Sequence, residues 1–159
     1  MIPVENPVVT YPLLELTIGL FILTLVILVH GIGVRMIYRH FSRAWELTGL
    51  KGSSWHYNGV VVVAIAALAA LHLAVTFMWA LPIYWGGLIL SLRDAYFFVL
   101  ENYTTLGDDT VSLPKSWRLI GPVIAISGLF NFGWTASVFV NMMHDIGTLD
   151  RAKARRERH

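Results

Sequence analysis

Three long apolar stretches, separated by shorter polar ones, dominate the pattern of this chain. They run over 13–34, 59–80 and 122–143. Each is about 20 residues long, which is the length that an α-helix needs to cross a hydrocarbon core of about 30 Å. The pattern therefore predicts an all-α membrane protein with three transmembrane helices.

A shorter segment from Ser91 to Tyr103 lies between the second and third stretches. At 1.5 Å per residue it covers about 18 Å, which is too short to cross a bilayer. Ser91 followed three residues later by Asp94 is a capping-box pattern, so we expect a helix to begin there. The polar, Gly-containing turn 104–107 is a poor sequence for extending it. A short helix, a polar turn and a further span predict a re-entrant pore helix, whose irregular backbone must be buried in protein or line a watery cavity.

The residues that flank the first two stretches indicate how those helices end. In the segment 35–58, apolar and aromatic residues from Met36 to Leu47 recur at roughly helical spacing with arginines between them, which predicts an amphipathic continuation along the inner membrane surface with Trp45 at headgroup depth. A simple linker is the alternative. Gly49 and Gly52 should break the helix before the second span. Pro82 should end or kink the second helix. Three aromatic residues there predict an interfacial belt: Trp79, Tyr84 and Trp85.

The composition supports a membrane protein and excludes several chemistries. Of 159 residues, 56% are hydrophobic and 14% are charged, which is more apolar than a soluble domain. There is no cysteine, so disulfides, thiolate metal sites and cysteine nucleophiles are excluded. The hydrolase motifs G-x-S-x-G and H-E-x-x-H are absent, and we expect no enzyme activity. No basic residue precedes the first apolar run, which is unlike a cleaved signal peptide.

The distribution of positive charge predicts the orientation in the membrane. Of twelve Lys and Arg, none precedes Leu13, four lie in 35–51 and five lie in the tail after Asp150. The positive-inside rule then places the N-terminus outside and both the 35–58 loop and the tail inside. The tail is expected to contact anionic membrane lipids rather than nucleic acid. The chain therefore divides into a first helix with its linker (1–58), a pore region (59–146) and a basic tail (147–159).

A few polar residues lie inside the apolar stretches. For Glu15 and His30, near the two ends of the first span, an interfacial or helix-packing role is favoured over an ion or proton site. His30 and His72 are candidates for a haem, but their spacing is not specific, and imidazoles bonded to neighbouring groups are favoured. We therefore expect no resident cofactor. Asn131 and Trp134 should face protein or a cavity, because their polar groups need partners at membrane depth.

A resemblance emerges from the order of these segments. A spanning helix, a short re-entrant helix, the sequence Tyr103-Thr104-Thr105-Leu106-Gly107 and a helix with interior glycines together resemble the pore module of the tetrameric potassium-channel superfamily. His72 with Trp79-Ala80, and Trp117 to Pro122 leading into Phe132-Gly133-Trp134, are similar to bacterial ion-channel proteins that carry one extra helix before the pore. The resemblance covers roughly 59–143. It implies a homotetramer in the bacterial inner membrane, built around a selectivity filter at Thr104–Asp109.

The resemblance also indicates what the filter binds. Rings of backbone carbonyls and a Thr hydroxyl from four copies replace the water shell of a cation. The potassium-selective form reads Thr-x-Gly-Tyr-Gly-Asp, whereas this chain has Thr105, Leu106, Gly107, Asp108, Asp109 and Thr110. Asp108 resembles the Thr-Val-Gly-Asp-Gly filter of the bacterial non-selective sodium/potassium channel.

The expected ion ligands are therefore Thr105, Leu106, Asp108 and Asp109. The eight carboxylates of a tetramer repel one another unless a hard divalent cation occupies the ring. We expect a non-selective K⁺ and Na⁺ pore that Ca²⁺ binds, blocks or crosses. The alternatives are a potassium-selective channel and a non-conducting membrane scaffold subunit.

The third span is expected to line the pore. Gly128 and Gly133 are either close-packing positions or a bend in this inner helix. Bulky side chains near its inner end are candidates for a constriction that gates the pore: Phe139, Met142 and Met143.

Overall fold

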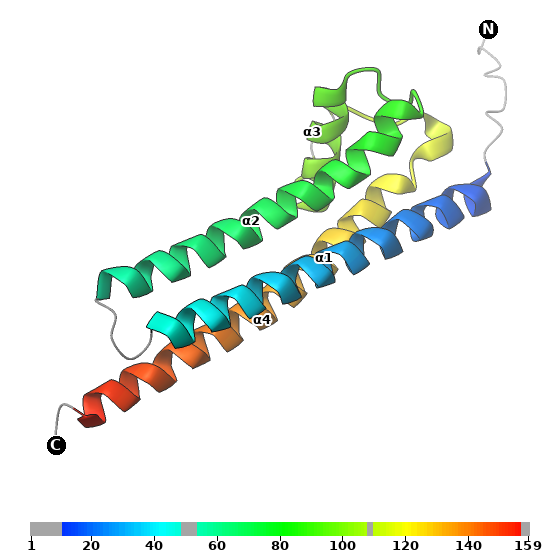
Figure 1. The fold of residues 1–159 in the computed structure, drawn as a ribbon. Coiled ribbons are helices and arrows are strands. Elements are labelled where there is room, and N and C mark those ends of the chain that lie inside the picture. Colours follow the sequence, from blue (N-terminus) through cyan, green and yellow to red (C-terminus); the bar gives the residue numbers. More distant parts are fainter. Residues whose placement is uncertain (1–10, 49–53, 108–109, 157–159) are drawn as a thin grey trace, which may run out of the picture. The chain divides into compact units, whose positions relative to one another are not determined.

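A computed structural model describes residues 11–48, 54–107 and 110–156 of this chain, and Figure 1 shows the helices in chain order. The described residues are all-helical outside their turns. The helices are α1 (Pro12–Thr48), α2 (Ser54–Trp85), α3 (Leu92–Tyr103), a short 3-10 helix η1 (Lys115–Trp117) and α4 (Ile120–Arg156).

Three of these helices are long and apolar enough to cross a membrane. The apolar spans within them are Pro12–Trp45, Asn58–Trp85 and Lys115–Thr148. This confirms the all-α class and the three helices of spanning length and apolarity. The helices run beyond the predicted stretches because good helix formers flank them, such as the Arg, Met, Leu and Glu residues after Val34. The segment 35–48 is thus a continuation of α1 and not a linker, whereas Gly49 and Gly52 lie outside the described residues.

Pro82 lies inside α2 and does not end it. A proline in the last turn loses only the hydrogen bond to the carbonyl four residues earlier, so the helix continues to Trp85. The helix ends at a glycine turn instead. Gly87, with φ of +68°, donates its N–H to the Tyr84 carbonyl, and the Leu88 N–H reaches the Ile83 carbonyl at 3.1 Å. Glycine adopts this left-handed conformation without strain, which makes it the usual residue at a helix C-terminus.

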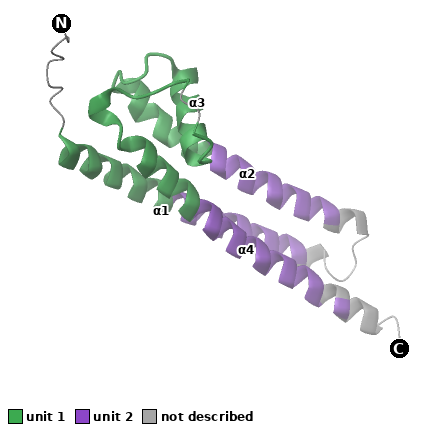
Figure 2. Cartoon of the chain, turned by 180° about the vertical axis from the view of Figure 1, so that it is seen from behind, with its two compact units in different colours: residues 1–28, 74–130 green, residues 29–73, 131–159 purple. Residues whose placement is uncertain are grey.

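The chain forms two compact units, which Figure 2 colours separately. The first unit combines the start of α1, the end of α2, α3 and the start of α4. Its core includes Trp79, Ala80, Ala95, Val99, Tyr103 and Ile124. Trp79 donates its indole N–H to Ser127 Oγ at 3.1 Å. The expectation that Trp79 joins an interfacial belt is therefore wrong, because its indole N–H finds a partner inside the unit, whereas Trp85 is exposed.

The second unit combines the rest of α1, the first part of α2 and the rest of α4. One buried cluster joins the three helices: Val34, Phe41, Trp45, Ala64, Leu68 and Met142. Phe41 and Trp45, one helical turn apart, stack with ring centroids 5.5 Å apart. Trp45 is packed inside protein, because the continued helix turns this aromatic pair toward the other two helices. Its headgroup depth stays a prediction.

Candidate functional site

Helix α3 begins where the sequence predicts. Ser91 has the extended backbone of an N-cap residue, and its Oγ accepts a hydrogen bond from the Asp94 N–H at 3.3 Å. This bond satisfies one of the N–H groups that have no partner at the start of a helix. The helix then ends at Tyr103, and Thr104 forms its C-cap.

The turn after α3 folds back on the end of the helix. The Leu106 N–H donates to the Glu101 carbonyl at 2.8 Å, and the Thr105 N–H donates to the Asn102 carbonyl at 3.0 Å. These two bonds define a Schellman motif, with Thr105 at the position where the chain turns left-handed. The Thr104 hydroxyl adds a bond to the Leu100 carbonyl at 2.8 Å. The backbone carbonyl groups at the end of α3 thus accept hydrogen bonds from the turn that follows it.

Two residues of this turn have a left-handed backbone. Thr105 has φ of 58° and Gly107 has φ of +71°. Glycine adopts this conformation without strain because it has no Cβ. Thr105 was not foreseen, because a β-branched residue in this conformation costs about 1–2 kcal/mol relative to glycine. Backbone strain of this kind concentrates at functional sites.

Helix α4 supports the turn through glycines. A Cβ added at Gly128 would lie 2.0 Å from the carbonyl oxygen of Tyr103, and one at Gly121 would lie 2.7 Å from Asn102 Oδ1. At Gly133 a Cβ would meet nothing within 4 Å. Gly128 is therefore a close-packing position against the end of α3, and the α4 helix continues through it. Gly121 was not predicted to have a packing role, because its partner Asn102 lies on another helix.

Glu15 of α1 fixes the start of α4. Its Oε1 accepts hydrogen bonds from the Leu119 N–H and from the Ile120 N–H, the latter at 3.2 Å. A carboxylate is favourable there because the first N–H groups of a helix have no intrahelical partner and carry partial positive charge. Glu15 is buried and has the helix-packing role that its position in the sequence favoured.

The candidate filter residues lie at the surface of a single chain. Thr104, Thr105, Leu106 and Gly107 are all exposed, and Leu106 is 71% exposed. Asp108 and Asp109 lie outside the described residues. A buried carboxyl group that the sequence analysis did not single out, that of Glu101, lies on the last turn of α3.

The gate candidates occupy different environments in the second unit. Met142 is buried in the cluster with α1 and α2. Phe139 is half-buried and Met143 is exposed. Of the three, Phe139 and Met143 have side-chain surface available to face a cavity.

A second polar cluster lies among the helices of the second unit. Thr135 Oγ1 of α4 is 3.0 Å from His30 Nε2 and 3.1 Å from His72 Nε2. Because a hydroxyl has one proton, it can donate to only one imidazole and must accept from the other. Asn131 lies one helical turn earlier and is fully buried, and its amide has no hydrogen-bond partner among the described residues. The two histidines are thus bonded to a neighbouring group, as expected, although nothing in the sequence pointed to Thr135.

The described parts of the chain hold no group of three or more His, Asp or Glu side chains that could bind a metal ion. Among the described residues, Thr105 in the turn after α3 is the non-glycine residue with a positive φ. Comparisons with protein-family models, curated proteins and solved structures found no match to this chain.

Proposed function

We propose that this protein is the subunit of a homotetrameric cation channel, in which Thr104–Asp109 of four chains surround the ion path. In this proposal α2 is the outer helix, α3 is a re-entrant pore helix and α4 is the inner helix. The observation that carries the proposal is Thr105, a β-branched residue with a left-handed backbone in an exposed turn. Such strain is retained where a function requires the conformation.

The carbonyl groups of the turn support an ion-binding role. Within the described residues, no hydrogen-bond donor reaches the carbonyl oxygens of Thr104, Thr105 or Leu106. At membrane depth, unpaired carbonyls are tolerated only where they line a cavity or bind something. Rings of such carbonyls from four chains, together with the Thr105 hydroxyl, replace the water shell of a cation.

The exposure of the turn supports an assembly of several chains. Leu106 is 71% exposed in a single chain, and one chain cannot enclose a pore. Neighbouring subunits around a fourfold axis would cover these side chains while the carbonyls point inward. The basic tail then faces the cytoplasm and the N-terminus faces outward across a bacterial inner membrane.

The residues after Gly107 set the expected selectivity. Asp108 and Asp109 stand where the potassium-selective pattern has tyrosine and glycine, so the outer carbonyl ring of that pattern is not expected to form. The pore then conducts K⁺ and Na⁺ without strong preference, and the carboxylates bind Ca²⁺ at its entrance.

A single engineered cysteine tests whether the turn surrounds an axis. The natural chain has no cysteine, so Thr105→Cys introduces one thiol per subunit. Cysteine thiolates are strong ligands of Zn²⁺, so thiols from several chains that meet at one axis should hold the ion in the ion path. Micromolar Zn²⁺ should therefore block cation flux through Thr105→Cys in liposomes. The matched control is Leu90→Cys, whose site is 88% exposed and lies before α3.

The two cysteine variants and the unmodified chain separate the possibilities. Block confined to Thr105→Cys, with a four-chain mass in native mass spectrometry, supports the channel. Equal sensitivity of all three proteins to Zn²⁺, or a mass that is not that of a tetramer, contradicts it and favours a non-conducting scaffold subunit.

A further inference from the structure

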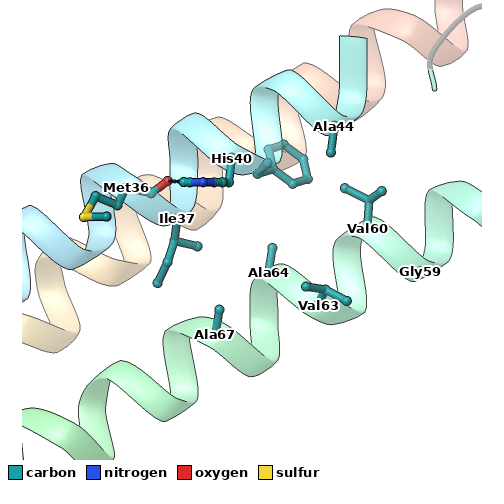
Figure 3. Close-up of a pocket in the computed structure, with 10 residues that line it drawn as sticks. Met36, Ile37, His40, Ala44, Gly59, Val60, Val63, Ala64 and Ala67 are labelled. Atoms are coloured by element: carbon teal, nitrogen blue, oxygen red, sulfur yellow. Dashed lines mark hydrogen bonds between the residues drawn. The ribbon is translucent and has the colours of Figure 1, made fainter. Parts of the chain in front are cut away.

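An apolar groove runs between α1 and α2 in the second unit (Figure 3). Its volume is about 890 Å³, which lies within the range of roughly 300–1,000 Å³ that small-molecule pockets occupy. Met36, Ile37 and Phe41 line it from α1, and Val60, Val63 and Ala67 line it from α2. The groove is thus large enough for a ligand and is lined mostly by apolar surface.

Small residues on one wall create the space. Figure 3 shows Ala64 and Ala67 of α2 pointing toward Ile37 of α1, and their short side chains do not fill the gap between the helices. All ten described residues that line the groove come from α1 and α2, and none from α4. Because both helices are apolar spans, hydrocarbon rather than water is the natural occupant of this space.

Basic groups border one edge of the groove. His40 donates its Nδ1–H to the Met36 carbonyl at 2.8 Å, which leaves Nε2 available to a ligand. Arg43 is exposed and lies three residues after His40 and seven after Met36, so it shares their edge of the helix. Basic residues beside a gap between membrane helices are the arrangement that binds anionic lipid headgroups.

We propose that this groove binds an anionic phospholipid. One acyl chain lies between Met36 and Ile37 of α1 and Ala67 of α2, and the phosphate contacts Arg43 and His40. The site does not depend on ion conduction. If the chain is also a channel with α4 toward the axis, a groove lined by α1 and α2 residues lies away from the ion path.

Charge substitutions test the headgroup contact. Native mass spectrometry of the full-length protein, titrated with phosphatidylglycerol and separately with phosphatidylcholine, measures both affinities. Arg43→Gln should weaken phosphatidylglycerol binding about fivefold, equivalent to about 1 kcal/mol, and leave phosphatidylcholine unchanged. The matched control is Arg35→Gln, an exposed arginine on the far side of the same helix. Equal losses in both variants overturn the proposal, because they indicate a general effect of charge.

Filling the groove tests the acyl-chain contact separately. Ala67→Phe should abolish binding of both lipids, whereas Val62→Phe should not, because Val62 is 63% exposed and does not line the groove. Retained binding in Ala67→Phe overturns the proposal. So does a loss of oligomer mass with lipid binding unchanged, which assigns the groove to a second copy of the chain. Far-UV ellipticity checks that each variant is folded, and Arg43→Gln tests the site without altering its packing.

Discussion

Gly128 offers the sharpest test of how the turn is supported. A Cβ at this position would lie 2.0 Å from the Tyr103 carbonyl oxygen and 2.9 Å from its carbonyl carbon. Both atoms belong to the backbone, so α4 and the end of α3 must separate by about 1 Å, an overpacking that costs about 1–3 kcal/mol. Alanine regains about 1 kcal/mol of helix propensity. With the clash near the upper end of its range, Gly128→Ala should lose about 1–2 kcal/mol of unfolding free energy.

Gly133→Ala is the matched control on the same helix. A Cβ there meets nothing within 4 Å, so the variant should gain up to about 1 kcal/mol from helix propensity alone. Denaturant unfolding in mixed micelles, followed by far-UV ellipticity, should therefore shift in opposite directions for the two variants. Gly128→Ala should also lose cation flux, because the turn moves with Tyr103. Equal stability of the two variants, with flux retained in Gly128→Ala, would refute the reasoning.

Three further predictions concern the turn, the expected carboxylate ring and the start of α4. Thr105→Gly should raise the free energy of unfolding by about 0.5–1 kcal/mol, because it removes left-handed strain of about 1–2 kcal/mol and adds some unfolded-chain entropy. Thr105→Ala keeps the strain and should not stabilise the chain. A Thr105→Gly protein less stable than the natural one would contradict the claim that Thr105 is strained. Replacing Asp108 and Asp109 by Asn should abolish the effect of Ca²⁺ on flux, and unchanged Ca²⁺ behaviour eliminates the carboxylate ring. Glu15→Ala should lower the free energy of unfolding by about 1–3 kcal/mol, because it leaves two N–H groups at the start of α4 unpaired. Glu15→Gln keeps an acceptor oxygen and should lose less. Equal losses of stability in thermal unfolding would contradict the claim that Glu15 caps α4.

Local physics explains the features that the sequence predicted correctly. A continuous apolar run such as 59–80 has few uses outside a membrane span, so the three spans follow from composition and length alone. The start of α3 depends on Ser91 and Asp94, which are three residues apart. In each case the residues that determine the structure are close together in the chain.

The missed features depend on partners far apart in the sequence. From the sequence alone, Trp79 has the features of an interfacial residue. In the structure its indole N–H donates to Ser127 of α4. Thr135 looks ordinary until two histidines from other helices meet its hydroxyl. Thr105 is left-handed although its residue type disfavours it, so no propensity argument finds it. The contacts of side chains at such positions can be predicted only once the packing of the helices is known.

The most direct test of the central claim is flux of K⁺ and Na⁺ through liposomes that contain the purified protein, compared with empty liposomes. Each ion is measured under its own gradient, and Gly128→Ala serves as the inactive control. We expect flux of both ions through the natural protein and little through the variant. No flux of either ion from a folded tetramer, or the same flux through Gly128→Ala, would contradict the claim that the turn after α3 forms a cation pore.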